Sequence, residues 1–177
     1  MLARWGIPSP AFALAGKETD PGVTNIRNTG SPHWCRWLGV EDRCVVPFTS
    51  FSEPEPLPDG RRPPAWFALA EDRPLACFAG ITVAGWRSAR KLKEGEVVAD
   101  LFGFLTCEPN AEVAAIHPKA MPVVLRTAEE INQWLQAPLA EALTLQRPLP
   151  DGALQIVARG EKQDGAEPPA PAQGLLL

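Results

Sequence analysis

The residues of this chain that are best suited to acid–base chemistry stand in short polar stretches beside apolar segments. One of the two histidines, His117, lies in "AIHPKAMP", where Pro118 and Pro122 stiffen the backbone around it. An imidazole titrates near neutrality and can accept or donate a proton. Glu53 in "FTSFSEPEP" offers a carboxylate, and Asn25 in "TNIRNT" offers an amide. A carboxylate and an imidazole that met in the folded chain would form an acid–base pair.

Further residues carry groups that nucleic acids bind. Arg4 and Trp5 stand in "ARWG", Arg27 in "TNIRNT" and Lys119 in "AIHPKAMP". An aromatic face can stack on a base, and a cation can pair with a phosphate. The run "RSARKLK", Arg87 to Lys93, adds four cations in seven residues without an acid, although charge alone explains it equally well as a solvated loop.

Each candidate also has an explanation that involves no function. Asn25 and Arg27 are residue types that are common in turns and on surfaces. An isolated glutamate such as Glu53 is usually solvated, and a lone histidine such as His117 often donates to a backbone carbonyl and does nothing more. Residue types alone leave both explanations open.

The composition indicates one domain followed by a tail. A chain of 177 residues is long enough to bury a sizeable core and too short for two ordinary domains. The apolar fraction of 45% and the charged fraction of 21% are typical of globular proteins, while 20 prolines and 14 glycines indicate a turn-rich fold dominated by strands. We expect the domain over residues 1–164 and a disordered tail over residues 165–177, where proline, alanine and acids dominate.

The same composition disfavours several classes of protein. No apolar run is long enough to span a bilayer, and the first residues lack the pattern of a signal peptide, so we expect a cytoplasmic protein without a membrane partner. The four cysteines form no C-x-x-C pair and have no histidine cluster at ligand spacing, so we expect neither a metal site nor another cofactor. The net charge of −4 does not point to nucleic acid, but total charge can hide a local basic patch.

The hydrophobic patterns predict strands beside most of the candidate residues. We expect the strand that contains Pro47 to be broken there. The polar "EDR" is expected to join the next two strands as a hairpin. The expected strands are residues 43–53, 65–70, 74–86, 99–109, 121–125 and 153–160, with the end of another at residues 4–7.

Short helices are predicted between the strands. Ser31, Asn110 and Thr127 are candidate N-caps, because each stands before a stretch with helical character. A further helix is expected to begin at Pro138. His117 would then follow a short helix and precede a strand.

Taken together, the motifs resemble one family. The stretches "ARWGIPSP", "TNIRNT", "RCVVPFTSFSEPE", "PLACFAGI", "FGFLTCEPNAEVAAIHPKAMPVVL" and "WL" follow the order and approximate spacing of the SOS response-associated peptidase (SRAP) family. That family's patterns include W-G-x-x-P, N-x-R, R-C-x-x-P followed by (F/Y)-x-E, T-x-x-(A/P)-N and I-H-x-(R/K)-x-M-P. The resemblance extends from Arg4 to Arg159. With the predicted elements, it implies a mixed α+β fold, in which a curved, mainly antiparallel sheet or barrel-like core carries a few short peripheral helices.

The resemblance implies a protein that recognises abasic sites in single-stranded DNA and links itself to them covalently. In the family, the nucleophile is a cysteine that follows the initiator methionine and becomes N-terminal by self-processing. Its α-amine condenses with the aldehyde of the open sugar, and its thiolate closes a thiazolidine ring. An α-amine with a pKa of about 7.7 to 8.0 is partly neutral at physiological pH, which suits the first step.

The resemblance also implies roles for the acid–base candidates. Asn25 would hydrogen-bond the linked sugar. Glu53 would be the acid/base that helps to open the deoxyribose and moves protons during imine formation. His117 would stabilise a phosphate or the sugar oxygen and assist proton transfer.

For DNA binding, the resemblance assigns Arg27 to an adjacent phosphate. Lys119 stands where the family usually has arginine, and Arg4 and Trp5 would contribute to the DNA groove. We expect the partner to be single-stranded DNA with abasic sites and the protein to be a monomer.

The sequence departs from the family at its beginning. Position 2 is Leu2, and "ARWG" corresponds to an interior segment of the family, so the nucleophilic cysteine is absent. As written, the chain should not form the thiazolidine. Either the start codon has been placed too far downstream, which we favour, or the chain is a truncated relative. Smaller departures are Lys119 for arginine, the extra Ala120, and Pro54 where an aromatic is frequent.

Two functions compete with the covalent one. The chain could be a non-covalent module that binds single-stranded DNA through Arg4, Trp5, Arg27 and the Arg87–Lys93 run. Alternatively, it could be a hydrolase built on Glu53 and His117 alone.

Overall fold

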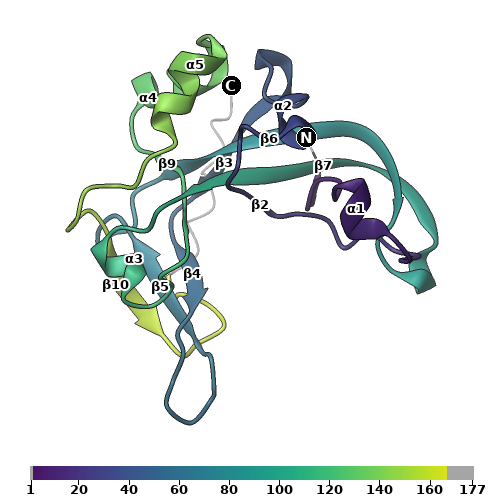
Figure 1. The fold of residues 1–177 in the computed structure, drawn as a ribbon. Coiled ribbons are helices and arrows are strands. Elements are labelled where there is room, and N and C mark those ends of the chain that lie inside the picture. The colour runs from purple at the N-terminus through teal and green to yellow at the C-terminus, as the bar shows by residue number, and fades with distance from the viewer. Residues whose placement is uncertain (1, 167–177) are drawn as a thin grey trace, which may run out of the picture.

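The computed structural model of the chain describes residues 2–166 and has the expected mixed α+β fold (Figure 1). The strands are β1 (Arg4–Trp5), β2 (Asn25–Ile26), β3 (Arg43–Phe48), β4 (Phe51–Pro54), β5 (Pro64–Ala68), β6 (Ala76–Ala89), β7 (Glu96–Cys107), β8 (Met121–Pro122), β9 (Val124–Leu125) and β10 (Gln155–Arg159). The α-helices are α1 (Ala11–Leu14), α2 (Pro32–Cys35), α3 (Ala111–Ala114), α4 (Ala128–Gln136) and α5 (Leu139–Ala142). Of the tail expected over residues 165–177, residues 167–177 lie outside the described residues.

The main sheet is built on β6 and β7, two long antiparallel strands that arch across the molecule (Figure 1). The sheet order is β1-β7-β6-β3, and the short β2, β8 and β9 pair beside it. Strands β1 and β2 run parallel to β7, which places Trp5 opposite Phe102 and Asn25 opposite Phe104. Over residues 2–166 the sheet is curved but does not close into a barrel, so the curved form of the prediction is confirmed.

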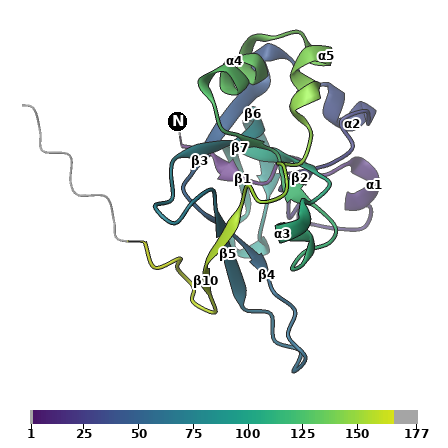
Figure 2. The same ribbon diagram turned by 90° about the vertical axis from the view of Figure 1, so that its left-hand side faces the viewer.

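A second, small sheet has the order β10-β5-β4 and lies at the end of the molecule away from α4 and α5 (Figure 2). Strand β4 follows β3 directly, because the chain leaves the main sheet after Phe48 and enters the small sheet at Phe51. The expected break at Pro47 is therefore wrong. Pro47 pairs with Cys77 inside β3, an edge strand of the main sheet in which a missing N–H is tolerated.

The expected hairpin between residues 65–70 and 74–86 is also wrong. Strand β5 pairs with β4 and β10, whereas β6 pairs with β3, β7 and β9. The aromatic residues of the two strands have different stacking partners, although Phe51 of β4 contacts both Phe67 and Phe78. Phe67 stacks on Phe51 within the small sheet, and Phe78 stacks on Phe48 in the main sheet, with ring centroids 5.5 and 4.0 Å apart.

The predicted helix caps are confirmed. Ser31 accepts from His33 N, Asn110 accepts from Val113 N and Thr127 accepts from Glu130 N. Each cap supplies an acceptor for an N–H that the first turn of a helix leaves free. None of the helices in residues 2–166 is long and apolar enough to cross a membrane.

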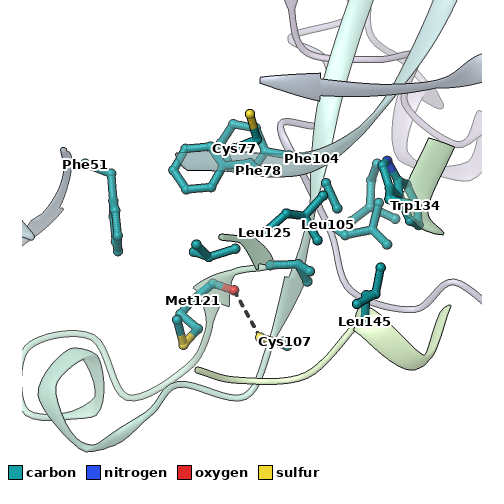
Figure 3. Close-up of a cluster of buried hydrophobic side chains, with 14 of the residues drawn as sticks. Phe51, Cys77, Phe78, Phe104, Leu105, Cys107, Met121, Leu125, Trp134 and Leu145 are labelled. Carbon is teal, nitrogen blue, oxygen red and sulfur yellow. Dashed lines mark hydrogen bonds between the residues drawn. The ribbon is translucent and has the colours of Figure 1, made fainter. Parts of the chain in front are cut away.

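The core lies between the main sheet and the elements that cover its two faces (Figure 3). On one face α4 inserts Trp134, which is 1% exposed and donates from Nε1 to Cys44 O at 2.8 Å. On the other face Phe51, Phe78 and Phe104 pack edge to face or obliquely. This second cluster forms the base of the cavity described below.

Candidate functional site

A cavity of about 400 Å³ opens beside the aromatic cluster, between the small sheet and the main sheet. Its lining comes from β1, β2, β3, β4, β6, β7 and β8 and from the loop after α3. The polar side chains in the lining are Asn25, Ser52, Glu53, Thr106 and His117. Segments that are far apart in the sequence therefore meet at one concave site.

Glu53 and His117 face each other across this cavity. His117 Nδ1 lies 3.1 Å from Glu53 Oε2, and the side chains are 34% and 17% exposed respectively. The contact lacks the alignment of a hydrogen bond, so the two groups meet as an ion pair when the ring is protonated. Burial raises the pKa of the Glu53 carboxyl above its ordinary value, and the charge of His117 only partly opposes this effect. A carboxyl with a raised pKa can exchange a proton closer to neutrality.

The position of His117 follows from the short helix before it. Asn110 caps α3, and the backbone N–H of His117 donates to Val113 O at 2.7 Å as the helix ends. Asp151 Oδ1 accepts from Ala111 N at 2.8 Å, which ties α3 to a separate loop. These bonds hold the imidazole at the rim of the cavity.

Asn25 reaches the same cavity from β2, where it is the first residue and pairs with Phe104 of β7. Its neighbour Ile26 is fully buried, so the alternation of the strand leaves Asn25 on the exposed side. The structure thus brings Asn25, Glu53 and His117 together at one site.

Aromatic rings form the apolar wall of the cavity. Trp5 is 52% exposed and stacks on Phe104, with ring centroids 5.3 Å apart and planes at 22°. Phe51, Phe78 and Phe102 extend the wall. Because one face of Trp5 packs on Phe104 and half of the side chain remains exposed, the ring offers a platform on which another flat group can stack.

None of the cationic candidates lines the cavity. Arg4 Nη1 donates to Glu94 Oε2 at 3.0 Å, and its side chain lines a different depression beside Val98. Arg27 is directed at backbone carbonyls and at Glu108. Lys119 is exposed two residues after His117.

The basic run from Arg87 to Lys93 does not form a continuous free patch. Arg90 is 8% exposed, and its Nη1 lies 3.8 Å from Asp20 Oδ1. Lys91 Nζ lies 3.1 Å from Glu94 Oε1, and Arg87 Nη1 lies 3.9 Å from Glu96 Oε2. Glu94 and Glu96, which follow the run directly, and the distant Asp20 therefore neutralise much of its charge.

Several residues of the site were not predicted. Ser52 and Thr106 line the cavity, and Thr106 could have been noticed because it begins the T-x-x-(A/P)-N pattern. Gln146 donates from Nε2 to the carbonyls of Arg27 and Thr106 at 2.8 and 3.0 Å. It lies far along the chain, and no motif marks it. Within residues 2–166, no three His, Cys, Asp or Glu side chains are grouped so that they could hold a metal ion.

The chain is similar to one protein family and to a solved structure. The family model described as SOS response associated peptidase (SRAP) matches residues 1–159. A crystal structure of a protein from Bacteroides thetaiotaomicron is 25% identical, with a TM-score of 0.57, over 74% of this chain and 56% of that one. The chain thus spans about half the length of that solved protein. No curated protein matches.

Proposed function

The chain belongs to the SOS response-associated peptidase family, a peptidase-type family associated with the response to DNA damage, and on that premise we propose that its cavity holds the sugar of an abasic site in single-stranded DNA. The observation that carries the proposal is the Glu53–His117 pair, which lies at 3.1 Å in a cavity that Asn25 also lines. A sugar without its base presents hydroxyl groups and, when open, an aldehyde. These are groups that an amide, a carboxyl and an imidazole can bind and protonate.

In this proposal Glu53 is the acid/base. Opening the deoxyribose ring requires a proton to be taken from the anomeric hydroxyl and another to be given to the ring oxygen. Burial raises the pKa of Glu53, so this carboxyl accepts and returns a proton closer to neutral pH than an ordinary glutamate does. His117, at 3.1 Å, stabilises the carboxylate when its ring is protonated. Asn25, which lies on β2 of the main sheet, orients the sugar.

The aromatic wall supports binding of the neighbouring nucleotide. Stacking of a base on an aromatic side chain contributes about 1–3 kcal/mol and tolerates any sequence. Trp5 is half exposed at the cavity, so a base next to the abasic position can stack there. Stacking on Trp5 serves any neighbouring base, so the proposed preference for an abasic position rests on the cavity beside it.

The proposed covalent step uses an N-terminal cysteine. Its amine attacks the aldehyde carbon and releases water to form an imine. Its sulfur then adds to the imine carbon while the thiol proton moves to nitrogen, which closes the thiazolidine ring. Cys35, Cys44, Cys77 and Cys107 are internal and carry no α-amine, so none of them can supply both groups.

The experiment is a trapping assay with a chain that begins with Met-Cys ahead of the sequence described above. We expect the protein and a labelled single strand with one abasic site to form a product that survives a denaturing gel. A matched chain that begins with Met-Ala should form none, and neither should an intact strand. Absence of the product with the Met-Cys chain would contradict the covalent function.

A non-covalent module for single-stranded DNA is the second candidate, favoured by the exposed Trp5 and by Lys119. It is weakened by the pairing of Arg4 with Glu94 and of Arg90 with Asp20. Titration of labelled abasic and intact strands separates the two candidates. The module predicts equal, salt-dependent affinities, whereas the abasic-site function predicts tighter binding of the abasic strand.

A further inference from the structure

A carboxylate occupies the outward edge of the Arg27 guanidinium. Nη1 donates to Cys107 O at 2.9 Å and to Lys119 O at 3.0 Å, so this nitrogen is directed toward the backbone. Nη2 is paired with Glu108, the residue directly after Cys107. The side chain of Arg27 is 40% exposed and that of Glu108 is 74% exposed. The ion pair therefore lies at the surface, where another anion can reach it.

This ion pair lies close to the lining of the cavity. Arg27 follows the lining residue Asn25 by two positions in the chain. Glu108 follows the lining residue Thr106 by two positions. A nucleic acid strand carries a phosphate on each side of every sugar, so a strand held in the cavity presents phosphates to cations near its rim. A guanidinium binds a phosphate with the same planar fork that binds a carboxylate.

We propose that Glu108 is an anionic placeholder, which pairs with the outward edge of Arg27 in the free protein and is displaced when a phosphate of the strand binds there. The carbonyl bonds of Nη1 aim the guanidinium, and the pairing of Nη2 with Glu108 identifies the edge that an anion takes. The inference rests on the proposed function, because it places a strand at the cavity.

The exchange keeps the number of ion pairs at Arg27 unchanged. A bound phosphate gains the guanidinium, but the carboxylate of Glu108 loses it, so Arg27 contributes less to affinity than an unpaired cation would. An exposed ion pair changes an equilibrium constant by about fivefold at most. Because every strand carries phosphates, the placeholder weakens the binding of intact and abasic strands alike. Selection between these strands is then left to the cavity.

The first measurement is the affinity for a labelled single strand with a stable abasic analogue over a range of salt concentrations. Glu108→Gln removes the charge of a mostly exposed side chain and keeps its size. We expect this variant to bind about two- to fivefold more tightly, with a salt slope that is steeper by up to about 0.7. Glu71→Gln, at an exposed glutamate outside the cavity lining, is the control for net charge and should bind like the wild type.

Two results of this titration would overturn the proposal. Unchanged affinity in Glu108→Gln would show that no phosphate competes with the carboxylate. Weaker binding would show that Glu108 assists the strand by orienting Arg27.

Arg27→Ala tests whether Glu108 acts through Arg27. The placeholder predicts that Glu108→Gln loses most of its effect in the Arg27→Ala background, because no guanidinium remains to be freed. An equal gain in both backgrounds would mean that Glu108 only repels the strand, which would overturn the proposal. If Arg27→Ala does not fold, the salt slope of Glu108→Gln and the titration described next decide the question.

A titration with inorganic phosphate makes the test independent of DNA. It is followed through the NMR signal of the Arg27 Nε–H in the chain without a strand. We expect Glu108→Gln to bind phosphate about two- to fivefold more tightly than the wild type does, and Glu71→Gln to match the wild type. Equal phosphate affinities in the wild type and Glu108→Gln would overturn the proposal. If the wild type bound neither an abasic nor an intact strand, the proposed function would fail, while this titration would still decide the role of Glu108.

Discussion

Replacing Glu53 with glutamine should stabilise the fold at neutral pH while it removes the proposed acid–base group. The carboxyl is only 17% exposed, and burial raises its pKa despite the opposing charge of His117. Between the unfolded and the raised folded pKa, the folded chain binds more protons than the unfolded chain. The free energy of unfolding of the wild type must therefore decrease as the pH rises through this interval.

The size of the effect follows from linkage. One proton of difference changes the free energy of unfolding by at most about 1.4 kcal/mol per pH unit. The decrease begins near the ordinary glutamate pKa of about 4.3 and ends once the folded pKa has been passed. Glutamine has nearly the same shape and no charge, so Glu53→Gln lacks this decrease. The free energy of unfolding of the variant should equal that of the wild type below about pH 4 and exceed it at about pH 7 to 8.

Urea unfolding followed by tryptophan fluorescence measures this difference, because the chain has six tryptophans. Glu71→Gln, at an exposed glutamate away from the cavity, is the control and should change stability by less than about 0.5 kcal/mol. Adding His117→Gln to both forms should widen the difference, because His117 lowers the pKa of Glu53. If Glu53→Gln were less stable than the wild type at neutral pH, attraction to His117 would outweigh burial, and the reasoning would be refuted.

Three further predictions concern the scaffold. Gly22 has a φ of +79°, and a Cβ there would lie 1.9 Å from Arg90 Nη1, so Gly22→Ala should destabilise the fold by about 3 kcal/mol or more by displacing Arg90 from Asp20. An unchanged urea midpoint would count against this packing. Trp134→Phe keeps an aromatic ring but loses donation to Cys44 O and Gly80 O, and should cost about 1–3 kcal/mol, less than the roughly 3–5 kcal/mol of Trp134→Ala. Equal losses in urea unfolding would show that these bonds contribute most of the stabilisation. Iodoacetamide should label exposed Cys35 well before Cys107, because burial raises the pKa of the Cys107 thiol to about 11, and peptide mass spectrometry showing equal rates would contradict that burial.

Local features of the fold were predictable because short-range chemistry determines them. Ser31, Asn110 and Thr127 each satisfy an N–H two or three residues away, so the sequence suffices to locate these caps. The partners of β5 and β6 were not predictable. The ring on which Phe67 or Phe78 stacks comes from another strand, and the polar link between β5 and β6 does not encode that choice.

The same distinction applies to the site. The motifs identified Asn25, Glu53 and His117, and the structure places all three around one cavity. They did not reveal what each cation contacts. Arg4 pairs with Glu94, which is 90 residues away, and Arg27 bonds to carbonyls that are 80 and 92 residues away. A motif records a residue type, whereas these partners are set by tertiary contacts.

The central claim is that the cavity holding His117 accepts an abasic sugar, and a histidine NMR titration tests it most directly. The chain has only two histidines, and His33 serves as a reference because its Nε2 lies 2.9 Å from Pro8 O, outside the cavity. We predict that a single strand with a stable abasic analogue shifts the His117 ring signal and leaves the His33 signal in place. An intact strand should shift the His117 signal less. If the abasic strand did not shift the His117 signal, or if both strands shifted it equally, the claim that the cavity accepts an abasic sugar would be contradicted.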